Sequence, residues 1–189
     1  MEHKKISINV EDNFLNENDL AFVHQYCYKS LYVYGEKDNS YSPNATGMVS
    51  EIYSSKNCKL NEEVENVHNY LIHKTFEYKN KYYEFADARV FPETHAFEQF
   101  RIKRYNNDGI DKFDTHVDVV NYATARRFLS FFWYLNDVET GGETRFKDVS
   151  VTPKQGTLVM FPPFWMFPHK AEPPVSNPKY LLHTYLHYK

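Results

Sequence analysis

The sequence predicts a mainly β domain of the α+β class, in which helices are confined to the N-terminal part. Apolar residues recur at helical spacing in two segments before residue 80, and from about residue 82 short strand-like segments alternate with turns. Aromatic residues make up 17% of the chain, with 16 Tyr and 15 Phe, and such side chains suit strands and pockets. A chain of 189 residues is long enough for one domain with a sizeable core.

The N-terminal part, residues 1–80, is expected to be a helical lead-in. Residues 5–10 alternate apolar and polar side chains and predict a first strand. An Asn-Glu-Asn-Asp cluster can cap a helix predicted over 17–30, and a second amphipathic helix is predicted over 61–77. Between them, the run 35–47 has the composition of a loop, either a solvated loop or a mobile lid.

The β-rich core is expected over residues 82–189. The turn sequences Asn-Asp-Gly, Gly-Gly, Pro-Lys-Gln-Gly and Pro-Pro separate its segments, and many short strands with such turns predict a sandwich or barrel. No internal repeat or linker is visible, so residues 1–189 are interpreted as a single domain. The predicted strands are 82–90, 96–105, 113–120, 126–136, 144–146, 157–161, 164–169 and 179–188.

The bulk properties argue against several classes of protein. The net charge is −3 and the pI is about 6.3, so no global basic field draws the chain to nucleic acid or to an anionic membrane. The first residues lack the apolar segment of a secretory signal, and no apolar run approaches transmembrane length, so a cytoplasmic location is expected. Cys27 and Cys58 are interpreted as free thiols of a reducing compartment.

His116 and Asp118 are the residues that point most directly to chemistry. Residues i and i+2 of a strand face the same side, so this imidazole and this carboxylate could bind one ion. A second histidine from a distant strand would complete a set that leaves coordination positions open and suits non-haem Fe(II). Three downstream histidines compete for that position, namely His169, His183 and His187.

Further motifs follow the His-x-Asp pair in a fixed order. With them, the chain resembles the prolyl-4-hydroxylase-like branch of the Fe(II)/2-oxoglutarate dioxygenases over roughly residues 98–189. A lone His-x-Asp would be weak support, whereas the ordered set is specific. The set comprises Tyr105, His116-Val-Asp118, Arg127, Tyr134-Leu-Asn, Gly141-Gly142-Glu143-Thr144, Pro153, Gly156, Phe161, His169, Pro173 and Lys179-Tyr180.

The resemblance implies a double-stranded β-helix, a jelly-roll relative, with the N-terminal helices packed on one sheet. It also implies that Fe(II) is bound by His116, Asp118 and His169, because His169 precedes Lys179 by the spacing of the family. Lys179 would pair with the far carboxylate of 2-oxoglutarate.

Other positions of the pattern are less specific. The resemblance implies that Tyr105 and Tyr134 help to hold the co-substrate, although either ring could belong to the core. Arg127 could face the substrate or form an ordinary ion pair. Gly141-Gly142-Glu143-Thr144 is interpreted as a structural turn with positive φ angles.

The sequence departs from the family pattern at three positions. Ser130 stands where the family often has Thr, His183 also replaces a frequent Thr, and Tyr185 replaces a usual Trp. These residues are candidates for a more polar cavity and for contacts with the substrate.

The implied activity is hydroxylation of an unactivated C–H bond, with prolyl 4-hydroxylation of a protein or peptide as the first interpretation. It would consume O2 and 2-oxoglutarate, with ascorbate as a candidate reductant, and the substrate would lie across loops such as 35–50 and 106–114. One alternative is a hydroxylase of a free amino acid, another small molecule or a nucleobase, although a chain without a basic stripe is a poor fit to nucleic acid. A third interpretation is a non-catalytic metal-dependent sensor or binding protein on the same fold.

Overall fold

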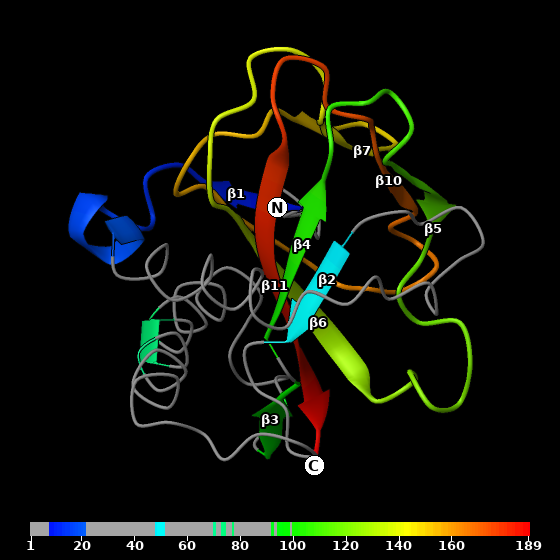
Figure 1. Ribbon diagram of the computed structural model, residues 1–189. Helices are drawn as coiled ribbons and strands as arrows, with labels where there is room; N and C mark the ends of the chain where they lie inside the picture. The colour runs from blue at the N-terminus through cyan, green and yellow to red at the C-terminus, as the bar shows by residue number, and fades with distance from the viewer. Residues whose placement is uncertain are drawn as a thin grey trace, which may run out of the picture.

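The computed structural model describes residues 8–21, 48–51, 70, 73–74, 77, 92, 94–98 and 100–189. This part of the chain is built from short antiparallel strands (Figure 1). Residues 17–21, and residues 70, 73, 74 and 77, are helical. The strands are β1 (Asn9–Glu11), β2 (Met48–Glu51), β3 (His95–Phe97), β4 (Arg101–Tyr105), β5 (Phe113–His116), β6 (Arg127–Tyr134), β7 (Thr144–Phe146), β8 (Ser150–Val151), β9 (Leu158–Phe161), β10 (His169–Ala171) and β11 (Lys179–Tyr188).

The strands form two antiparallel sheets. The larger sheet has the order β1-β9-β6-β11-β4-β2, and β3 pairs with the end of β11. The smaller sheet has the order β5-β10-β7-β8. Figure 1 shows β5, β10 and β7 beside the long central strands, and an apolar cluster joins residues of both sheets, so the sheets face each other as in a sandwich.

The central strands of the larger sheet are buried on both faces because each face packs on a separate apolar cluster. In β6, Leu129, Phe131 and Trp133 belong to an outer cluster, and Phe132 and Tyr134 belong to the inner cluster between the sheets. This is the period-2 alternation of a strand, in a segment where five of the eight residues are aromatic. The outer cluster also contains Leu15 and Leu20 of the N-terminal part, and Tyr70 packs against it.

A bulge at the start of β6 interrupts the alternation. Leu186 of β11 pairs with Leu129, but the next residue, His187, pairs with Arg127, so that Phe128 is the extra residue. Phe128 consequently joins the outer cluster, whereas the guanidinium of Arg127 reaches the backbone of Asp118 on the inner side. If β6 had alternated regularly from Ser130, Phe128 would have faced the inner side and Arg127 the outer side.

The structure confirms much of the strand prediction and corrects some of it. The ranges of β7 and β11 are those predicted, and the segment 96–105 is divided into β3 and β4. The strand predicted at 164–169 is wrong: Phe167 N donates to Phe164 O in a turn, and Trp165 and Met166 are exposed. Strands β2 and β8 were not predicted.

Several predictions fall on residues outside the described part. These are the strand at 82–90, Cys27 and Cys58, the loop 35–47 and most of both N-terminal helices. Among the described residues, no helix has the length and apolar character required to cross a membrane.

Candidate metal centre and its pocket

Strand pairing brings the two candidate histidine ligands together. His116 is the last residue of β5, and His169 is the first residue of β10, directly opposite it in the smaller sheet. Asp118 follows β5 by two residues. One ligand atom from each of these three side chains lies within 4.8 Å of the others, and no other such group of three or more occurs in the described part of the chain.

Both histidines are oriented by backbone carbonyl groups. The Nδ1 atom of His116 lies 2.7 Å from the carbonyl oxygen of Asp114, and the Nδ1 atom of His169 lies 3.1 Å from that of Phe167. A carbonyl only accepts, so each Nδ1 carries the proton and each Nε2 keeps a free lone pair. The two Nε2 atoms face the carboxylate of Asp118, at 3.7 Å and 3.9 Å.

The surroundings keep both imidazoles neutral. Burial and the neighbouring His169 together lower the pKa of His116 to about 4, although Asp118 opposes the shift. Burial also lowers the pKa of His169, again against the attraction of Asp118. Aromatic rings supply much of this burial: Phe113 lies 3.8 Å from the ring centroid of His116, and Phe161 packs edge-on against His169 at 4.8 Å. Neutral imidazole is the form that binds a metal.

Asp118 is held from two directions. The Tyr185 hydroxyl donates to its Oδ1 at 2.8 Å, and Arg127 Nη1 donates to its backbone carbonyl at 3.2 Å. The other carboxylate oxygen, Oδ2, is buried and has no hydrogen-bond partner among the described residues. A buried unpaired carboxylate oxygen beside two imidazole lone pairs fits a divalent cation, and the set of two histidines and one carboxylate is typical of non-haem Fe(II).

Arg127 forms an ion pair, which is one of the two roles predicted for it. Its Nε and Nη2 atoms donate to the two oxygens of Glu98 at 2.8 Å and 2.9 Å, and its guanidinium lies 4.1 Å from the ring centroid of Tyr185. Burial acts to raise the pKa of Glu98, but Arg127, together with Arg101 and His187, outweighs burial, and the pKa is lowered. Arg127 therefore connects Glu98, Tyr185 and Asp118 in one group.

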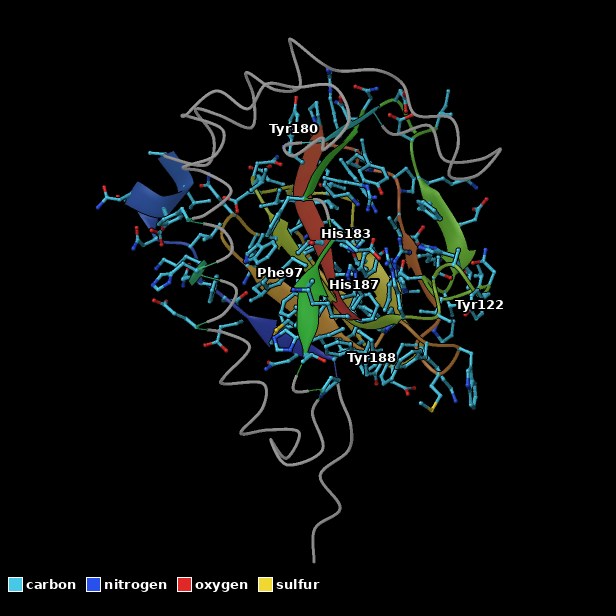
Figure 2. The ribbon with its side chains drawn as sticks, turned by 90° about the horizontal axis from the view of Figure 1, so that it is seen from below. Phe97, Tyr122, Tyr180, His183, His187 and Tyr188 are labelled. Atoms are coloured by element: carbon cyan, nitrogen blue, oxygen red, sulfur yellow. The ribbon has the colours of Figure 1, made fainter. Side chains whose placement is uncertain are left out.

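His183 and Ser130 lie on the same inner face. The His183 Nε2 atom is 3.0 Å from the Ser130 hydroxyl oxygen, and burial holds the pKa of His183 well below its usual range. Figure 2 shows His183 and His187 along β11, with Tyr122 at the periphery of the molecule. Neither histidine belongs to the group of three ligand atoms, so of the three competing histidines only His169 lies with His116 and Asp118.

Lys179 is a fully buried cation at the start of β11. Its side chain is 0% exposed, its Nζ donates to the carbonyl oxygen of Gly142 at 2.9 Å, and it lies 4.3 Å from the ring centroid of Tyr105. Burial lowers the pKa of Lys179 to about 7, only partly opposed by Glu143 and Glu172. The ammonium group thus lacks a close carboxylate partner, and an incoming carboxylate would stabilise its charged form.

The Gly141-Gly142 turn is the bend that the sequence predicts. The φ angles are 77° and 75°, and a Cβ on Gly141 would lie 2.6 Å from the carbonyl oxygen of Pro173. The turn has a further role that the sequence did not show, because it presents the Gly142 carbonyl to Lys179.

A pocket connects the three candidate ligands with the interior between the sheets. Tyr134 does not line it; the Tyr134 hydroxyl donates to the Thr144 hydroxyl at 2.7 Å, and Thr144 lines the pocket instead. Sequence reasoning missed Thr144, although it ends the Gly-Gly-Glu-Thr motif. The lining residues are Lys103, Tyr105, Phe113, His116, Asp118, Phe132, Thr144, Phe161, His169, Ala171, Leu181 and His183.

Lys103 is a second lysine on the inner face, and sequence reasoning also missed it. It lies two residues before Tyr105 in β4 and lines the pocket. Burial lowers the pKa of Lys103 to about 8, with Asp118 opposing the shift. The alternation of a strand could have indicated it, since residues 103 and 105 share a face.

Residues 100–187 match the family described as the 2OG-Fe(II) oxygenase superfamily. The matched segment is just under half of the chain. A segment of 66 residues is 42% identical to Probable prolyl 4-hydroxylase 9 of Arabidopsis thaliana, covering 32% of this chain and 22% of that protein. The chain therefore spans about a fifth of the length of this curated relative.

Solved structures show the same fold at low sequence identity. The viral collagen prolyl hydroxylase of Paramecium Bursaria Chlorella virus-1 superposes with a TM-score of 0.68 at 19% identity, covering 96% of both chains. A Pseudomonas putida prolyl-4-hydroxylase gives 0.72 at 15% identity, over 98% of this chain and 94% of the other. A Trichoplax adhaerens prolyl hydroxylase, in complex with a hypoxia inducible factor peptide fragment, gives 0.75 at 16% identity, over 97% and 84%. These similarities confirm the double-stranded β-helix fold expected from the sequence.

Proposed function

We propose that this protein is an Fe(II)- and 2-oxoglutarate-dependent dioxygenase that hydroxylates prolyl residues of a peptide or protein. The observation that carries the proposal is the meeting of two neutral imidazoles and the Asp118 carboxylate within 4.8 Å at the pocket. Proline is favoured as the target because both the curated relative and the similar solved structures are described as prolyl hydroxylases. A peptide substrate is favoured because one of these structures holds a peptide fragment.

In this proposal, His116, Asp118 and His169 hold the iron, and Lys179 holds the far carboxylate of 2-oxoglutarate. When bound, iron and 2-oxoglutarate together activate O2 for insertion of one oxygen atom into a C–H bond. Tyr105 lies against Lys179, so both would contact the same end of the co-substrate. Tyr134 would act through Thr144, to which its hydroxyl donates.

The protein's own contribution is to orient these groups and to exclude water. The carbonyl oxygens of Asp114 and Phe167 hold the two imidazoles in the tautomer that leaves Nε2 free. Tyr185 and Arg127 fix the Asp118 carboxylate and its backbone. Such outer partners keep ligands in position and tune their basicity.

The apolar walls of the pocket have the second task. Phe132, Phe161 and Leu181 line it, and their side chains are 1% to 6% exposed. In these dry surroundings a buried lysine and an incoming carboxylate attract each other more strongly than in water. We also infer that the N-terminal lead-in belongs to the same domain as the β-rich core, since Leu20 and Tyr70 pack on the outer cluster.

An anaerobic titration of the metal-free protein with Fe(II) and 2-oxoglutarate tests the iron and co-substrate sites. A visible charge-transfer band that is weakened in Lys179→Ala would support the proposal. Absence of the band in folded native protein would instead favour a binding protein on the same fold.

The substrate class needs a separate assay. Succinate release would be measured with proline-containing peptides, with the same peptides carrying alanine in place of proline, and with free proline. Stimulation by the proline peptides alone supports the proposal, whereas stimulation by free proline would favour a hydroxylase of free amino acids.

A further inference from the structure

Lys103 is the charged pocket residue that the proposed function does not use. It lies in the middle of β4, directly opposite Leu181 of β11. Its partly buried side chain lines the same pocket as His116, Asp118 and His169. Lys179, by contrast, pairs with Tyr105 at the end of β4, two residues further along the strand.

Within the described residues, the Lys103 ammonium group has no hydrogen-bond acceptor and no ion pair. The ring of Phe113 lies near it, with the ring centroid 5.9 Å from Nζ. Asp118 attracts it, whereas Arg101 and Arg127 repel it. Lys179 differs, because the Gly142 carbonyl accepts a hydrogen bond from it. Lys103 is therefore a partly buried cation whose counter-charge is the carboxylate assigned to the metal.

Metal binding would remove this counter-charge. A divalent cation held by Asp118 takes up the negative charge that attracts Lys103, and it adds positive charge to the same pocket. Of the two carboxylates of 2-oxoglutarate, Lys179 would pair with one and the metal would bind the other. Lys103 would then remain unpaired in a partly desolvated site, which is costly unless a ligand supplies an anion.

We propose that Lys103, which lines the pocket, is a second carboxylate-binding residue, separate from Lys179. The inference rests on the proposed function and deepens it. The carboxylate has two sources: the 2-oxoglutarate carboxylate at the metal, or an acidic group of the substrate next to the target proline.

Binding measurements on protein loaded with Mn(II) test the proposal without turnover. Calorimetric titrations would give the Kd of 2-oxoglutarate, and then the Kd of two proline-containing peptides that differ only in Glu or Gln beside the proline. Each would be measured for the native protein, Lys103→Met and Lys103→Arg. Lys112→Met is the matched control, because Lys112 is 47% exposed and pairs with Asp114 at 3.0 Å outside the pocket.

We expect Lys103→Met to weaken one carboxylate ligand by about 30-fold or more, the loss typical of removing one partner of a buried charge pair. Weaker 2-oxoglutarate binding identifies the co-substrate as the source. An unchanged Kd for 2-oxoglutarate, with loss of the preference for Glu over Gln, identifies the substrate. Lys103→Arg keeps the charge and should lose less than Lys103→Met, and Lys112→Met should match the native protein.

The proposal is overturned if Lys103→Met matches the native protein for both ligands, or if Lys103→Arg loses as much affinity as Lys103→Met. A native protein that binds neither Mn(II) nor 2-oxoglutarate contradicts the proposed function itself, and the inference fails with it. The thermal midpoint controls for folding: removal of an unpaired buried cation should leave it unchanged or raise it. If Lys103→Met does not fold, Lys103→Gln replaces it in every titration.

Discussion

The two faces of the larger sheet differ sharply, although the same strands build both. Toward the outer side, β6 and β11 contribute Phe131, Trp133, Leu182 and Leu186 to a cluster of apolar side chains. Toward the inner side, the alternate residues of the same strands carry most of the polar chemistry, namely Ser130, Tyr134, Lys179, His183 and Tyr185. The comparison teaches that the outer face stabilises the fold, whereas the inner face buries polar and charged groups at a cost in stability.

The sharpest test of this division removes a candidate ligand. Asp118→Ala should abolish Fe(II) binding, because the remaining imidazoles lack the carboxylate that completes the set. Folding should persist, since the substitution also removes a buried oxygen without a partner among the described residues. Metal content after dialysis against Fe(II) or Mn(II), together with circular dichroism, measures both. Stoichiometric metal in Asp118→Ala would contradict the assignment.

Substitution of two neighbouring leucines of β11 compares the contributions of the two faces to stability. Leu182 is 0% exposed in the outer cluster, whereas Leu181 lines the pocket. Leu182→Ala should lower the free energy of unfolding by about 2–5 kcal/mol, because it leaves a cavity in a packed core. Leu181→Ala should lower it less, since the space opens into an existing pocket, and it should weaken 2-oxoglutarate binding instead. Urea unfolding gives both values, and equal losses would mean that the faces do not differ as described.

Lys179→Met should separate binding from stability on the inner face. It should weaken 2-oxoglutarate binding by about 2–5 kcal/mol, the cost of truncating one partner of a buried charge pair. The thermal midpoint should stay level or rise, because the ammonium is fully buried without a close carboxylate. Calorimetry on Mn(II)-loaded protein is the measurement, with Lys154→Met as the exposed control. A large drop in stability would make Lys179 a structural residue.

Tyr185→Phe tests an outer partner of the metal. The variant keeps the ring under Arg127 but removes the hydroxyl that donates to Asp118 Oδ1. Metal affinity should fall by about 10–100-fold, as for other outer partners of metal ligands. Competition with a chelator measures it, and Tyr180→Phe on the opposite face of β11 is the control. Unchanged affinity would show that the hydrogen bond does not orient the ligand.

The last expected effect concerns the pH dependence of stability. The pKa of His116 in the folded, metal-free protein is lowered to about 4, below the value of an unfolded histidine. Between pH 6.5 and about 4 the unfolded chain therefore binds more protons, and the fold loses up to about 1.4 kcal/mol per pH unit for each histidine that stays neutral. Urea unfolding of the metal-free protein across this range measures the slope. His116→Gln should reduce it, and an identical slope in that variant would contradict the lowered pKa.

The candidate metal ligands and Lys179 could be predicted from the sequence more readily than the residues that surround them. His116, Asp118 and Lys179 could be chosen from local spacing and from the ordered motifs, because strand periodicity and ligand type are short-range properties. Arg127 could not be placed, since a bulge turns it to the inner side. Thr144 could not be assigned to the pocket, because its position follows from the pairing of β7 with β10. Lys103 was missed although it shares a face of β4 with Tyr105.

The sequence by itself determined the class of fold, most strands of the core and the residue types of the proposed iron site. It did so because alternation and turn chemistry act between neighbours in the chain. Tertiary structure alone decided that Arg127 turns to the inner side beside Asp118, and that 162–168 forms a loop. Strand register and the packing of two sheets set those outcomes, and they depend on contacts between residues far apart in the chain.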